Sequence, residues 1–376
     1  MKIAVLGAGM VGSTIAGDLS DRHEVVSFDK NEEALNRLRR RHPKISVLPA
    51  DLTYWAAYPD MLGDADLVVS AVPGFMGYKT LEAVINAGKS VVDISFFPEE
   101  ALMLDDLAKK KGVTAVTDCG VAPGMGNLIL GRFNEEMKVD RFECYVGGLP
   151  SIRKKPFEYK APFSPIDVIE EYTRPARLKE NGKIVTKSAL SDRQLMHFEG
   201  IGTLEAFNTD GLRSLLYTMP HIPDLKEQTL RYPGHVDLIL ALQMAGFFSE
   251  EAIEVKGQQI RPVDASAAIL FKEWKLGEEE PEFTVMRVLV EGKKEGKPMR
   301  VEYNLLDRYD PAGKNSSMSR TTGFTCAAVT ELVARGQFRE KGVFPPELVG
   351  KHAECFEFIL RYLTNRGVNW EAIINS

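Results

Sequence analysis

The chain has few of the features that mark several common protein classes. Its 376 residues contain only four cysteines, with no CxxC pair, at Cys119, Cys144, Cys326 and Cys355. Neither a disulfide framework nor a zinc site is therefore expected, and the thiols fit a reducing compartment. No apolar run approaches the roughly 20 residues that span a bilayer, and a strand pattern starts at residue 2, which leaves no room for a signal peptide. We expect a cytoplasmic protein without membrane contact.

Other absences narrow the chemistry. The net charge is −6 and no basic stripe is present, which argues against nucleic-acid binding. The sequence contains neither an HExxH metal motif nor a GxSxG nucleophile elbow. We expect no bound metal. The hydrophobic fraction of 44% and the charged fraction of 27% are typical of a soluble globular protein, and the length favours two domains.

A glycine-rich turn lies at the start of the chain. The apolar strand Lys2–Leu6 runs directly into Gly7, Gly9 and Gly12, and a helical pattern follows at once. This strand, turn and helix context is the one that the dinucleotide fingerprint requires. The first glycine permits the tight turn, the second lets the backbone approach a pyrophosphate, and the third lets helix and strand pack closely. The free N–H groups of the helix N-terminus then face the phosphates.

An acidic residue follows the second expected strand. Asp29 stands about 20 residues after the turn, where a carboxylate accepts hydrogen bonds from a ribose 2′-hydroxyl and repels a 2′-phosphate. NAD is therefore expected rather than NADP, although the neighbouring Lys30 could soften that repulsion. The residues expected to contact this cofactor are Gly7, Gly9, Met10, Val11, Gly12, Asp29, Asp51, Val72, Pro73 and Gly120.

Strand and helix patterns alternate up to about residue 124. Six strands are expected, at 2–6, 24–28, 45–48, 66–72, 90–94 and 113–117. Such alternation predicts an α/β doubly wound parallel sheet of the Rossmann type, with all carboxyl ends of the strands on one rim. Helices are expected in this part at 31–40, 78–87, 99–110 and 125–136.

The pattern changes in the middle of the chain. Residues 141–146 alternate with period two as in a half-buried strand, whereas 148–165 lack periodicity and predict a loop. The dipeptide Asn181-Gly182 predicts a hairpin over 178–185, and a second pair of strands is expected at 283–290 and 299–305. This region therefore predicts an α+β domain with a mainly antiparallel sheet. Helical patterns return at 324–335 and 353–365.

Two acids follow strands of the expected parallel sheet. Asp93 and Asp118 lie where ligands bind such sheets, outside the carboxyl ends of the strands. Each could serve as a helix N-cap or a partner for loop N–H groups. Each could instead accept a proton or hold an amine beside the nicotinamide, with a pKa tuned by burial.

A second group of polar residues lies in the middle region. Arg213 and Arg231 have the forked guanidinium that binds an amino-acid carboxylate, although each could equally form a salt bridge within the protein. Tyr232 follows Arg231 and is taken as a further substrate contact. Glu199 and His235 are candidates for a general base, and a histidine here could also be an ordinary hydrogen-bonded side chain.

These motifs together resemble the saccharopine dehydrogenase (reductase) family. The blocks that carry the resemblance are the glycine turn with Asp29, the run Val69–Pro73, the segment Asp118–Gly124 and the segment Thr229–His235. The resemblance implies a dinucleotide-binding domain over 1–124 with 318–376. It also implies a substrate-binding domain over 125–317 that covers the cofactor cleft and forms a homodimer. NAD is the implied cofactor.

The resemblance also implies a reaction. It is strongest to members that oxidatively deaminate the lysine ε-amine to 2-aminoadipate 6-semialdehyde, which cyclises to piperideine carboxylate, with release of ammonia. Asp93 or Asp118 would then orient the amine, and Glu199 or His235 would be the base. One alternative is a reductase that forms or cleaves a secondary amine, such as saccharopine or carboxynorspermidine, for which the middle region is short. Another is a non-catalytic NAD-binding sensor.

Overall fold

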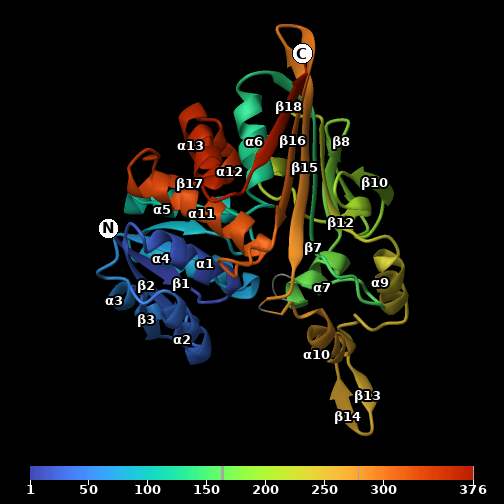
Figure 1. The fold of residues 1–376 in the computed structure, drawn as a ribbon, viewed down its shortest axis with the longest axis horizontal. Coiled ribbons are helices and arrows are strands. Elements are labelled where there is room, and N and C mark those ends of the chain that lie inside the picture. Colours follow the sequence, from blue (N-terminus) through green and yellow to red (C-terminus); the bar gives the residue numbers. More distant parts are fainter. Residues whose placement is uncertain (162–164, 278, 376) are drawn as a thin grey trace. The chain divides into compact units, whose positions relative to one another are not determined.

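The chain folds into two compact units. The computed structural model describes residues 1–161, 165–277 and 279–375. One unit comprises Met1–Lys138 with Met318–Trp370, and the other comprises Val139–Ser317 with Glu371–Ser376 (Figure 1). Helix α6 (Met125–Asn134) therefore belongs to the first unit, whereas the sequence analysis placed it after a boundary at residue 124. The substrate-binding and dimerisation roles given to the second unit stay predictions.

The first unit is built on a parallel sheet. Its strand order is β17-β6-β5-β4-β1-β2-β3. The strands are β1 (Lys2–Leu6), β2 (Glu24–Asp29), β3 (Ser46–Pro49), β4 (Leu67–Ser70), β5 (Ser90–Asp93), β6 (Thr114–Val116) and β17 (Gly342–Phe344). The order reverses between β1 and β4, which is where open α/β sheets bind ligands. The expected doubly wound parallel sheet is confirmed.

Helices connect the strands of this sheet. They are α1 (Met10–Leu19), α2 (Glu32–Arg41), α3 (Tyr58–Met61), α4 (Gly74–Asn86), α5 (Asp105–Lys111), α6, α11 (Ser317–Ala334), α12 (Pro346–Gly350) and α13 (Ala353–Thr364). Asn31 caps α2 by accepting a hydrogen bond of 3.1 Å from the Ala34 amide. Helix α4 begins one turn earlier than expected, and α11 begins about two turns earlier.

The seventh strand was not foreseen. Strand β17 pairs in parallel with β6, and its three residues extend the sheet from a segment more than 200 residues downstream. A segment of this length shows no detectable periodicity, which is why the sequence analysis found only six strands. The C-terminal segment therefore supplies a sheet edge as well as helices.

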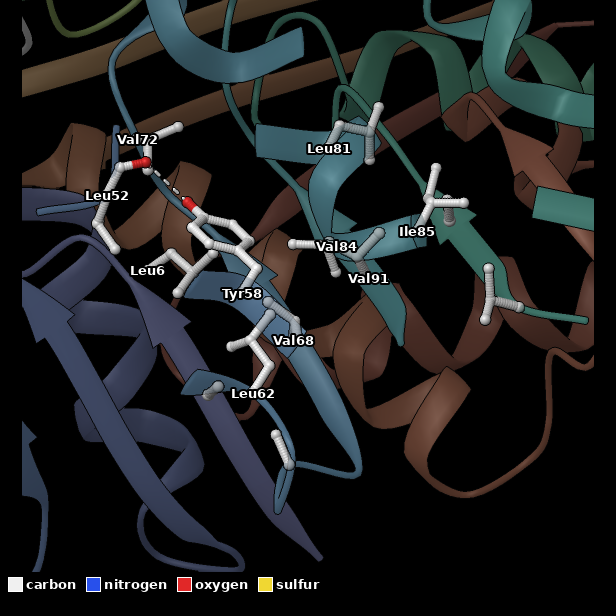
Figure 2. Close-up of a cluster of buried hydrophobic side chains, with 14 of the residues drawn as sticks. Leu6, Leu52, Tyr58, Leu62, Val68, Val72, Leu81, Val84, Ile85 and Val91 are labelled. Carbon is white, nitrogen blue, oxygen red and sulfur yellow. Dashed lines mark hydrogen bonds between the residues drawn. The ribbon is translucent and has the colours of Figure 1, made fainter. Parts of the chain in front are cut away.

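Apolar side chains pack between the sheet and the helices α3 and α4. Figure 2 shows Leu6 and Val68 from neighbouring strands beside Tyr58, with Leu81 and Val84 from α4 on the same side. The Tyr58 hydroxyl donates a hydrogen bond of 3.0 Å to the Leu52 carbonyl, so its polar tip is satisfied inside the core. Burial of each such aliphatic side chain contributes about 1.5–3 kcal/mol, and this packing fixes the positions of the strand ends.

The second unit contains a sheet of nine strands. Seven run in the order β10-β11-β12-β7-β15-β16-β18, while β8 pairs with β12 and β9 pairs with β8. The strands are β7 (Lys138–Pro150), β8 (Ala176–Glu180), β9 (Lys183–Lys187), β10 (Gln194–Phe198), β11 (Gly202–Asn208), β12 (Asp224–Arg231), β15 (Glu282–Lys294), β16 (Lys297–Arg308) and β18 (Trp370–Asn375). Strand β12 runs parallel to β7, whereas β11, β16 and β9 lie antiparallel to their partners. The mainly antiparallel sheet is confirmed.

The hairpin at Asn181-Gly182 is confirmed. Both residues have positive φ angles, 50° and 80°, as a type I′ turn requires, and they connect β8 to β9. The predicted loop 148–165 is corrected at both ends, because β7 continues to Pro150 and α7 (Pro165–Thr173) starts at its last residue. Residues 162–164 of that loop lie outside the described residues.

Three further helices and a small hairpin complete the unit. They are α8 (Leu215–Thr218), α9 (His235–Met244), α10 (Pro262–Trp274), β13 (Ile253–Val255) and β14 (Gln258–Ile260). Strands β13 and β14 pair only with each other in the described structure.

Candidate active site

The glycine turn is closed by direct backbone contact. Gly7 has a φ of 107°, and a Cβ placed there would lie 2.5 Å from the Ala71 carbonyl oxygen. A Cβ on Gly12 would lie 2.2 Å from the Gly7 carbonyl oxygen. Only glycine therefore fits either position without moving backbone atoms.

The start of α1 is suited to bind phosphate. The helix has no side-chain cap at Gly9 and no acidic residue in its first turn, which includes Met10 and Val11. A Cβ on Gly9 would meet nothing within 4 Å, so the space beside its backbone is open. Uncapped amide groups that face open space at a helix N-terminus form an anion site. This geometry fits the pyrophosphate of a dinucleotide, as the sequence predicts.

Asp29 lies beside this turn. One oxygen of its carboxylate accepts a hydrogen bond of 2.7 Å from the Ala8 amide, and the other accepts one of 2.8 Å from the Asn31 amide. The acid thus ties the end of β2 to the glycine turn and retains free lone pairs for a ribose hydroxyl. Its contact with a ribose hydroxyl stays a prediction.

The remaining predicted cofactor residues follow other strands. Asp51 is exposed after β3, and hydrogen bonds from the Thr53 hydroxyl and amide lower the pKa of its carboxyl. Val72 is buried after β4, while Pro73 is exposed and precedes α4, whose start also has no side-chain cap. Their contacts with a cofactor stay predictions.

Asp93 is the most deeply buried acid at this edge of the sheet. The register pairs Leu6 with Ser70 and Ser70 with Asp93, so the three residues lie in one row across β1, β4 and β5. With neighbouring strands about 4.8 Å apart, Asp93 lies about 10 Å from the last residue of β1. The row therefore leads from the glycine turn to the acid.

The surroundings of Asp93 shift its protonation into the neutral range. Its side chain has no exposed surface, and burial raises the pKa of the carboxyl to about 7. Hydrogen bonds from the hydroxyls of Ser70 and Ser95 oppose this rise, and the charge of Asp118 adds to it. The Ser95 amide and hydroxyl donate bonds of 3.0 and 2.9 Å to the two carboxylate oxygens. An acid of this kind can exchange a proton near pH 7.

Asp118 is held by a tight loop after β6. It has a φ of 55°, and its side chain is 5% exposed. In this loop the Gly120 amide donates to the Pro123 carbonyl at 3.1 Å, and a Cβ on Gly124 would clash with the Gly120 carbonyl oxygen. The Cys119 amide donates to the Asp93 carbonyl at 3.0 Å, which joins the two acidic segments. The structure thus brings both predicted acids together.

A buried hydrogen-bonded chain in the second unit includes Arg231 and His235. The Arg231 guanidinium donates to the Tyr172 hydroxyl at 2.9 Å, and that hydroxyl lies 3.0 Å from Nε2 of His235. Nδ1 of His235 lies 2.9 Å from the Phe157 carbonyl, which can only accept, so Nδ1 carries the proton and Nε2 accepts from Tyr172. Burial, followed by the charge of Arg231, lowers the pKa of His235 to about 3. His235 is therefore neutral near pH 7, with both nitrogens hydrogen-bonded inside the protein.

The hydrogen-bonded chain of side chains continues from Arg231 to Glu171. Arg231 forms an ion pair with Glu171 at 3.3 Å and lies over the ring of Tyr159, 4.6 Å from its centroid. The Thr229 hydroxyl donates to the other oxygen of Glu171. Arg231 therefore already has a carboxylate partner within its own unit.

Glu227 is the last residue of this hydrogen-bonded chain of side chains. The hydroxyls of Thr209 and Thr229 lie 2.9 Å apart, and Thr209 donates to Glu227 at 2.8 Å. Burial raises the pKa of Glu227 to about 8, and the charges of Glu171 and Asp210 act in the same direction. This carboxyl is therefore protonated over much of the neutral range.

Other residues that the sequence predicts for the site lie outside this hydrogen-bonded chain of side chains. Glu199 lies in the exposed turn between β10 and β11 and, among the described residues, has no hydrogen bond to either cluster. Tyr232 donates to the Pro150 carbonyl at 3.0 Å, and Arg153 lies over its ring. Arg213 is nearly buried, with a φ of 46°, in the segment that precedes α8. Substrate contacts of Tyr232 and Arg213 stay predictions.

Several residues of the two clusters were missed from the sequence. Ser70 and Ser95 bind Asp93, while Glu171, Tyr172 and Glu227 belong to the hydrogen-bonded chain of side chains in the second unit. Ser70 stands in the run Val69–Pro73 and Ser95 follows Asp93 by two residues, so their positions at strand ends were a usable signal. Glu171 and Tyr172 belong to α7, a short helix beside the expected loop, and offered none.

Two family models match the chain. The model described as "Saccharopine dehydrogenase NADP binding domain" covers residues 3–116, and the model described as "Saccharopine dehydrogenase C-terminal domain" covers residues 120–368. The chain belongs to the saccharopine dehydrogenase family. The resemblance inferred from the motifs is confirmed. The family is one of oxidoreductases, and its first domain binds a nicotinamide dinucleotide.

Relatives within the saccharopine dehydrogenase family differ in length. Alpha-aminoadipic semialdehyde synthase of Mus musculus is 24% identical over 70% of this chain and 30% of its own length. Saccharopine dehydrogenase [NADP(+), L-glutamate-forming] of Schizosaccharomyces pombe is 27% identical over 67% of this chain and 59% of its own length. Carboxyaminopropylagmatine dehydrogenase of Synechocystis sp. is 21% identical over 100% of this chain and 98% of its own length. The alignments thus span less than two thirds of the first two relatives.

A solved structure has the same fold. Apo saccharopine dehydrogenase (L-Glu forming) from Saccharomyces cerevisiae superposes with a TM-score of 0.79, at 20% identity and with complete coverage of both chains. Within the described residues, no group of His, Cys, Asp and Glu is arranged to hold a metal ion. None of the described helices combines the length and apolar character that a membrane crossing needs.

Proposed function

We propose that the chain oxidises the ε-amine of L-lysine with NAD⁺. Lysine, NAD⁺ and water give 2-aminoadipate 6-semialdehyde, ammonia, NADH and a proton, and the semialdehyde then cyclises to piperideine carboxylate. The observation that carries the proposal is the buried Asp93, with a pKa near 7, beside Asp118 at the carboxyl edge of the dinucleotide-binding sheet. An ammonium group must lose a proton before hydride can leave its carbon, and a base with a pKa near the working pH performs this transfer best.

Asp93 and Asp118 have different roles in this proposal. A bound nicotinamide supplies the hydride acceptor. Asp118, which has some exposed surface, holds the substrate amine. The proton of the substrate ammonium group passes through Asp118 to Asp93. Once that proton has passed to solvent, the same pair takes a proton from the water that attacks the imine carbon and returns it to the nitrogen, which leaves as ammonia. Glu199 is exposed and His235 has both nitrogens hydrogen-bonded, so we assign the role of base to Asp93 in preference to either.

Arg213 and Arg231 are proposed to hold the α-carboxylate of the substrate. Arg231 is buried and aligned by Tyr172, which fixes the fork that a carboxylate binds. Glu171 occupies one side of this fork, so the substrate carboxylate has to share or replace that partner. Tyr232, next in the chain, is proposed to line the same part of the site.

NAD is proposed as the cofactor in preference to NADP. The matching family model is described as an NADP-binding domain, and the S. pombe relative is named for NADP(+). In this chain, however, Asp29 presents a carboxylate beside the glycine turn. A 2′-phosphate placed near this charge would be repelled, whereas a 2′-hydroxyl could donate to it.

A secondary-amine oxidoreductase is the second candidate. The relative that aligns over the whole chain is named carboxyaminopropylagmatine dehydrogenase, and others are named saccharopine dehydrogenase. This alignment favours an enzyme that forms or cleaves a secondary amine. A non-catalytic NAD-binding sensor is a third possibility and would lack turnover altogether.

One assay separates these functions. The purified protein is incubated with NAD⁺ and, in separate reactions, L-lysine, L-ornithine, saccharopine or carboxyaminopropylagmatine, while NADH absorbance and free ammonia are measured. We expect lysine alone to give NADH and ammonia in equal amounts. Faster oxidation of a secondary amine without ammonia would favour the second candidate, and NAD⁺ binding without NADH from any amine would favour the sensor.

A further inference from the structure

A polar cavity lies in the first unit, lined by residues outside the candidate active site. It has a volume of about 260 Å³, and its walls come from the segment after α1, from the end of α11 and from α13. Four arginines and two aromatic rings line it, namely Arg22, Arg335, Arg361, Arg366, Phe358 and Tyr362. Natural ligand sites start at about 300 Å³, so the cavity suits a small ligand.

Two carboxylates neutralise only part of the arginine charge. Asp18 pairs with Arg22 at 3.0 Å and with Arg366 at 2.5 Å. Glu331 pairs with Arg22 at 2.6 Å and with Arg335 at 2.9 Å, and its side chain is 1% exposed. Four guanidinium groups thus face two acids, which leaves two positive charges. Three of these guanidinium groups, those of Arg22, Arg335 and Arg366, are held by these buried or nearly buried carboxylates.

Arg361 differs from the other three arginines of the cavity in having N–H groups that remain available to bind an anion. It lies in the last turn of α13 and is exposed, and within the part of the chain that the structure describes it has no ion-pair partner. The neighbouring Arg366 stacks on the ring of Tyr362, with its guanidinium carbon 3.4 Å from the ring centroid. Arg335 lies 5.4 Å from the centroid of Phe358. The rings hold the guanidinium planes in place, which reduces the side-chain entropy lost on binding an anion.

This cavity is separate from the cofactor site. Arg22 follows the C-terminal end of α1, whereas the glycine turn precedes its N-terminus. A helix of ten residues is about 15 Å long, so the two sites lie at opposite ends of it. The arginines therefore cannot contact the pyrophosphate held at the glycine turn.

We infer that this arginine cavity binds a small phosphate-bearing ligand, either inorganic phosphate or a phosphate monoester. The two uncompensated charges match a phosphate dianion, and the guanidinium fork matches its oxygens. Bound there, the ligand bridges segments separated by more than 300 residues, because Arg22 and Arg361 both line the cavity. Binding should therefore raise the melting temperature of the folded chain.

Calorimetric titration with inorganic phosphate tests the inference. The full chain is first saturated with NAD⁺, so that the glycine turn is filled, and chloride is used to match the ionic strength. We expect one phosphate per chain with millimolar or tighter affinity, and a Kd increase of at least about tenfold in Arg361→Ala. Arg335→Ala should weaken binding in the same direction.

The matched control is Arg40→Ala. Arg40 is an exposed arginine in the last turn of α2 and lies outside the cavity, so phosphate affinity should not change. Glucose 6-phosphate in place of phosphate distinguishes the ester from the free anion, and either result supports the site. Equal phosphate affinity in Arg361→Ala and the parent chain would overturn it, as would tighter binding of succinate than of phosphate.

Discussion

Asp93 is the residue whose protonation is most sensitive to pH in the candidate site. Burial raises the pKa of its carboxyl to about 7, so the fraction that can accept a proton increases through the neutral range. We expect log(kcat/KM) for lysine to rise with pH through about 7 and then to level off. In Asp93→Asn this limb should vanish, with kcat/KM reduced at least about 10²-fold.

Ser95→Ala is the control for this assignment. The Ser95 hydroxyl lowers the pKa of Asp93, so its loss should move the limb to higher pH while activity at high pH is retained. Asp93 also makes the free energy of unfolding depend on pH. Because the pKa of Asp93 in the folded chain lies above its ordinary value, the folded chain binds more protons than the unfolded chain between about pH 4 and 7. The free energy of unfolding therefore falls as the pH rises through that window. A limb that stays unchanged in Asp93→Asn would remove Asp93 from the proposed mechanism.

Asp29 makes a second testable contribution, to the choice of cofactor. Replacement by Ser keeps a small hydrogen-bonding side chain and removes the charge that would face a 2′-phosphate. We expect Asp29→Ser to raise the ratio of kcat/KM for NADP⁺ to that for NAD⁺ by roughly tenfold or more. Glu32→Gln, which removes an exposed charge from the first turn of α2, should leave the ratio unchanged. An unchanged ratio in Asp29→Ser would contradict the proposed NAD preference.

Glu171 tests whether Arg231 binds substrate. If the substrate carboxylate shares the guanidinium with Glu171, then Glu171→Gln weakens a competitor and should lower KM for lysine severalfold while kcat stays similar. Arg231→Ala should raise KM by about tenfold or more. A lower melting temperature in Glu171→Gln with no change in KM would show that the ion pair serves stability alone.

At the residue scale, local sequence was informative where chemistry depends on neighbours in the chain. The glycines and Asp29 could be predicted because a fixed spacing puts the glycines in one turn and Asp29 at the end of the next strand, beside that turn. Ser70 beside Asp93, and Tyr172 and Glu171 beside Arg231, come from other elements, so these contacts depend on packing. The occupied nitrogens of His235 could not be foreseen for the same reason.

The turn between β1 and α1 gives a prediction at the scale of an element. A Cβ on Gly12 would clash with the Gly7 carbonyl, whereas one on Gly9 would enter open space. We expect Gly12→Ala to destabilise the chain by a few kcal/mol. Gly9→Ala should leave the melting temperature within a few degrees and weaken NAD⁺ binding about tenfold or more, measured by titration calorimetry. Unchanged NAD⁺ affinity in Gly9→Ala would show that the space is not used by the cofactor.

Element prediction succeeded where a segment alternated regularly, formed an apolar run between turn residues or carried a turn signal. The turn dipeptide Asn181-Gly182 identified one hairpin, and the alternating Val301, Tyr303 and Leu305 identified strand β16. Strand β17 has three residues and α7 borders a segment without periodicity, and both were missed. Short elements owe their structure to partners far away in the sequence, so local pattern does not reveal them.

Exposed apolar side chains of the second unit suggest how whole chains associate. In the second unit, seven large apolar side chains are exposed by 36% to 87% on α9, α10, β13 and the loop after α9: Leu238, Met244, Phe247, Ile253, Val255, Ile269 and Phe271. Strands β13 and β14 form a hairpin whose residues are almost all exposed (Figure 1). A lone two-stranded hairpin is only marginally stable in water, and a second copy can pair with its open edge.

We therefore propose that the chain forms a homodimer and that these residues form its interface. The double substitution Met244→Glu with Phe247→Glu places charges among these apolar side chains, and light scattering after gel filtration should show a shift from dimer to monomer. Leu195→Glu, at another exposed apolar position on β10, should leave the dimer intact. A dimer that persists in the double variant would place the interface elsewhere.

The position of β17 at the edge of the parallel sheet also has a consequence for synthesis of the chain. Residues 1–116 contain six of the seven strands, but the strand that covers β6 is not made until residue 344. At 5–20 residues per second, the ribosome needs about ten to fifty seconds for the intervening stretch. During that time the nascent chain carries an open parallel strand edge, a template for pairing with other chains. Cellular yield of this protein should therefore depend on chaperones that bind nascent chains, more than its final stability would indicate.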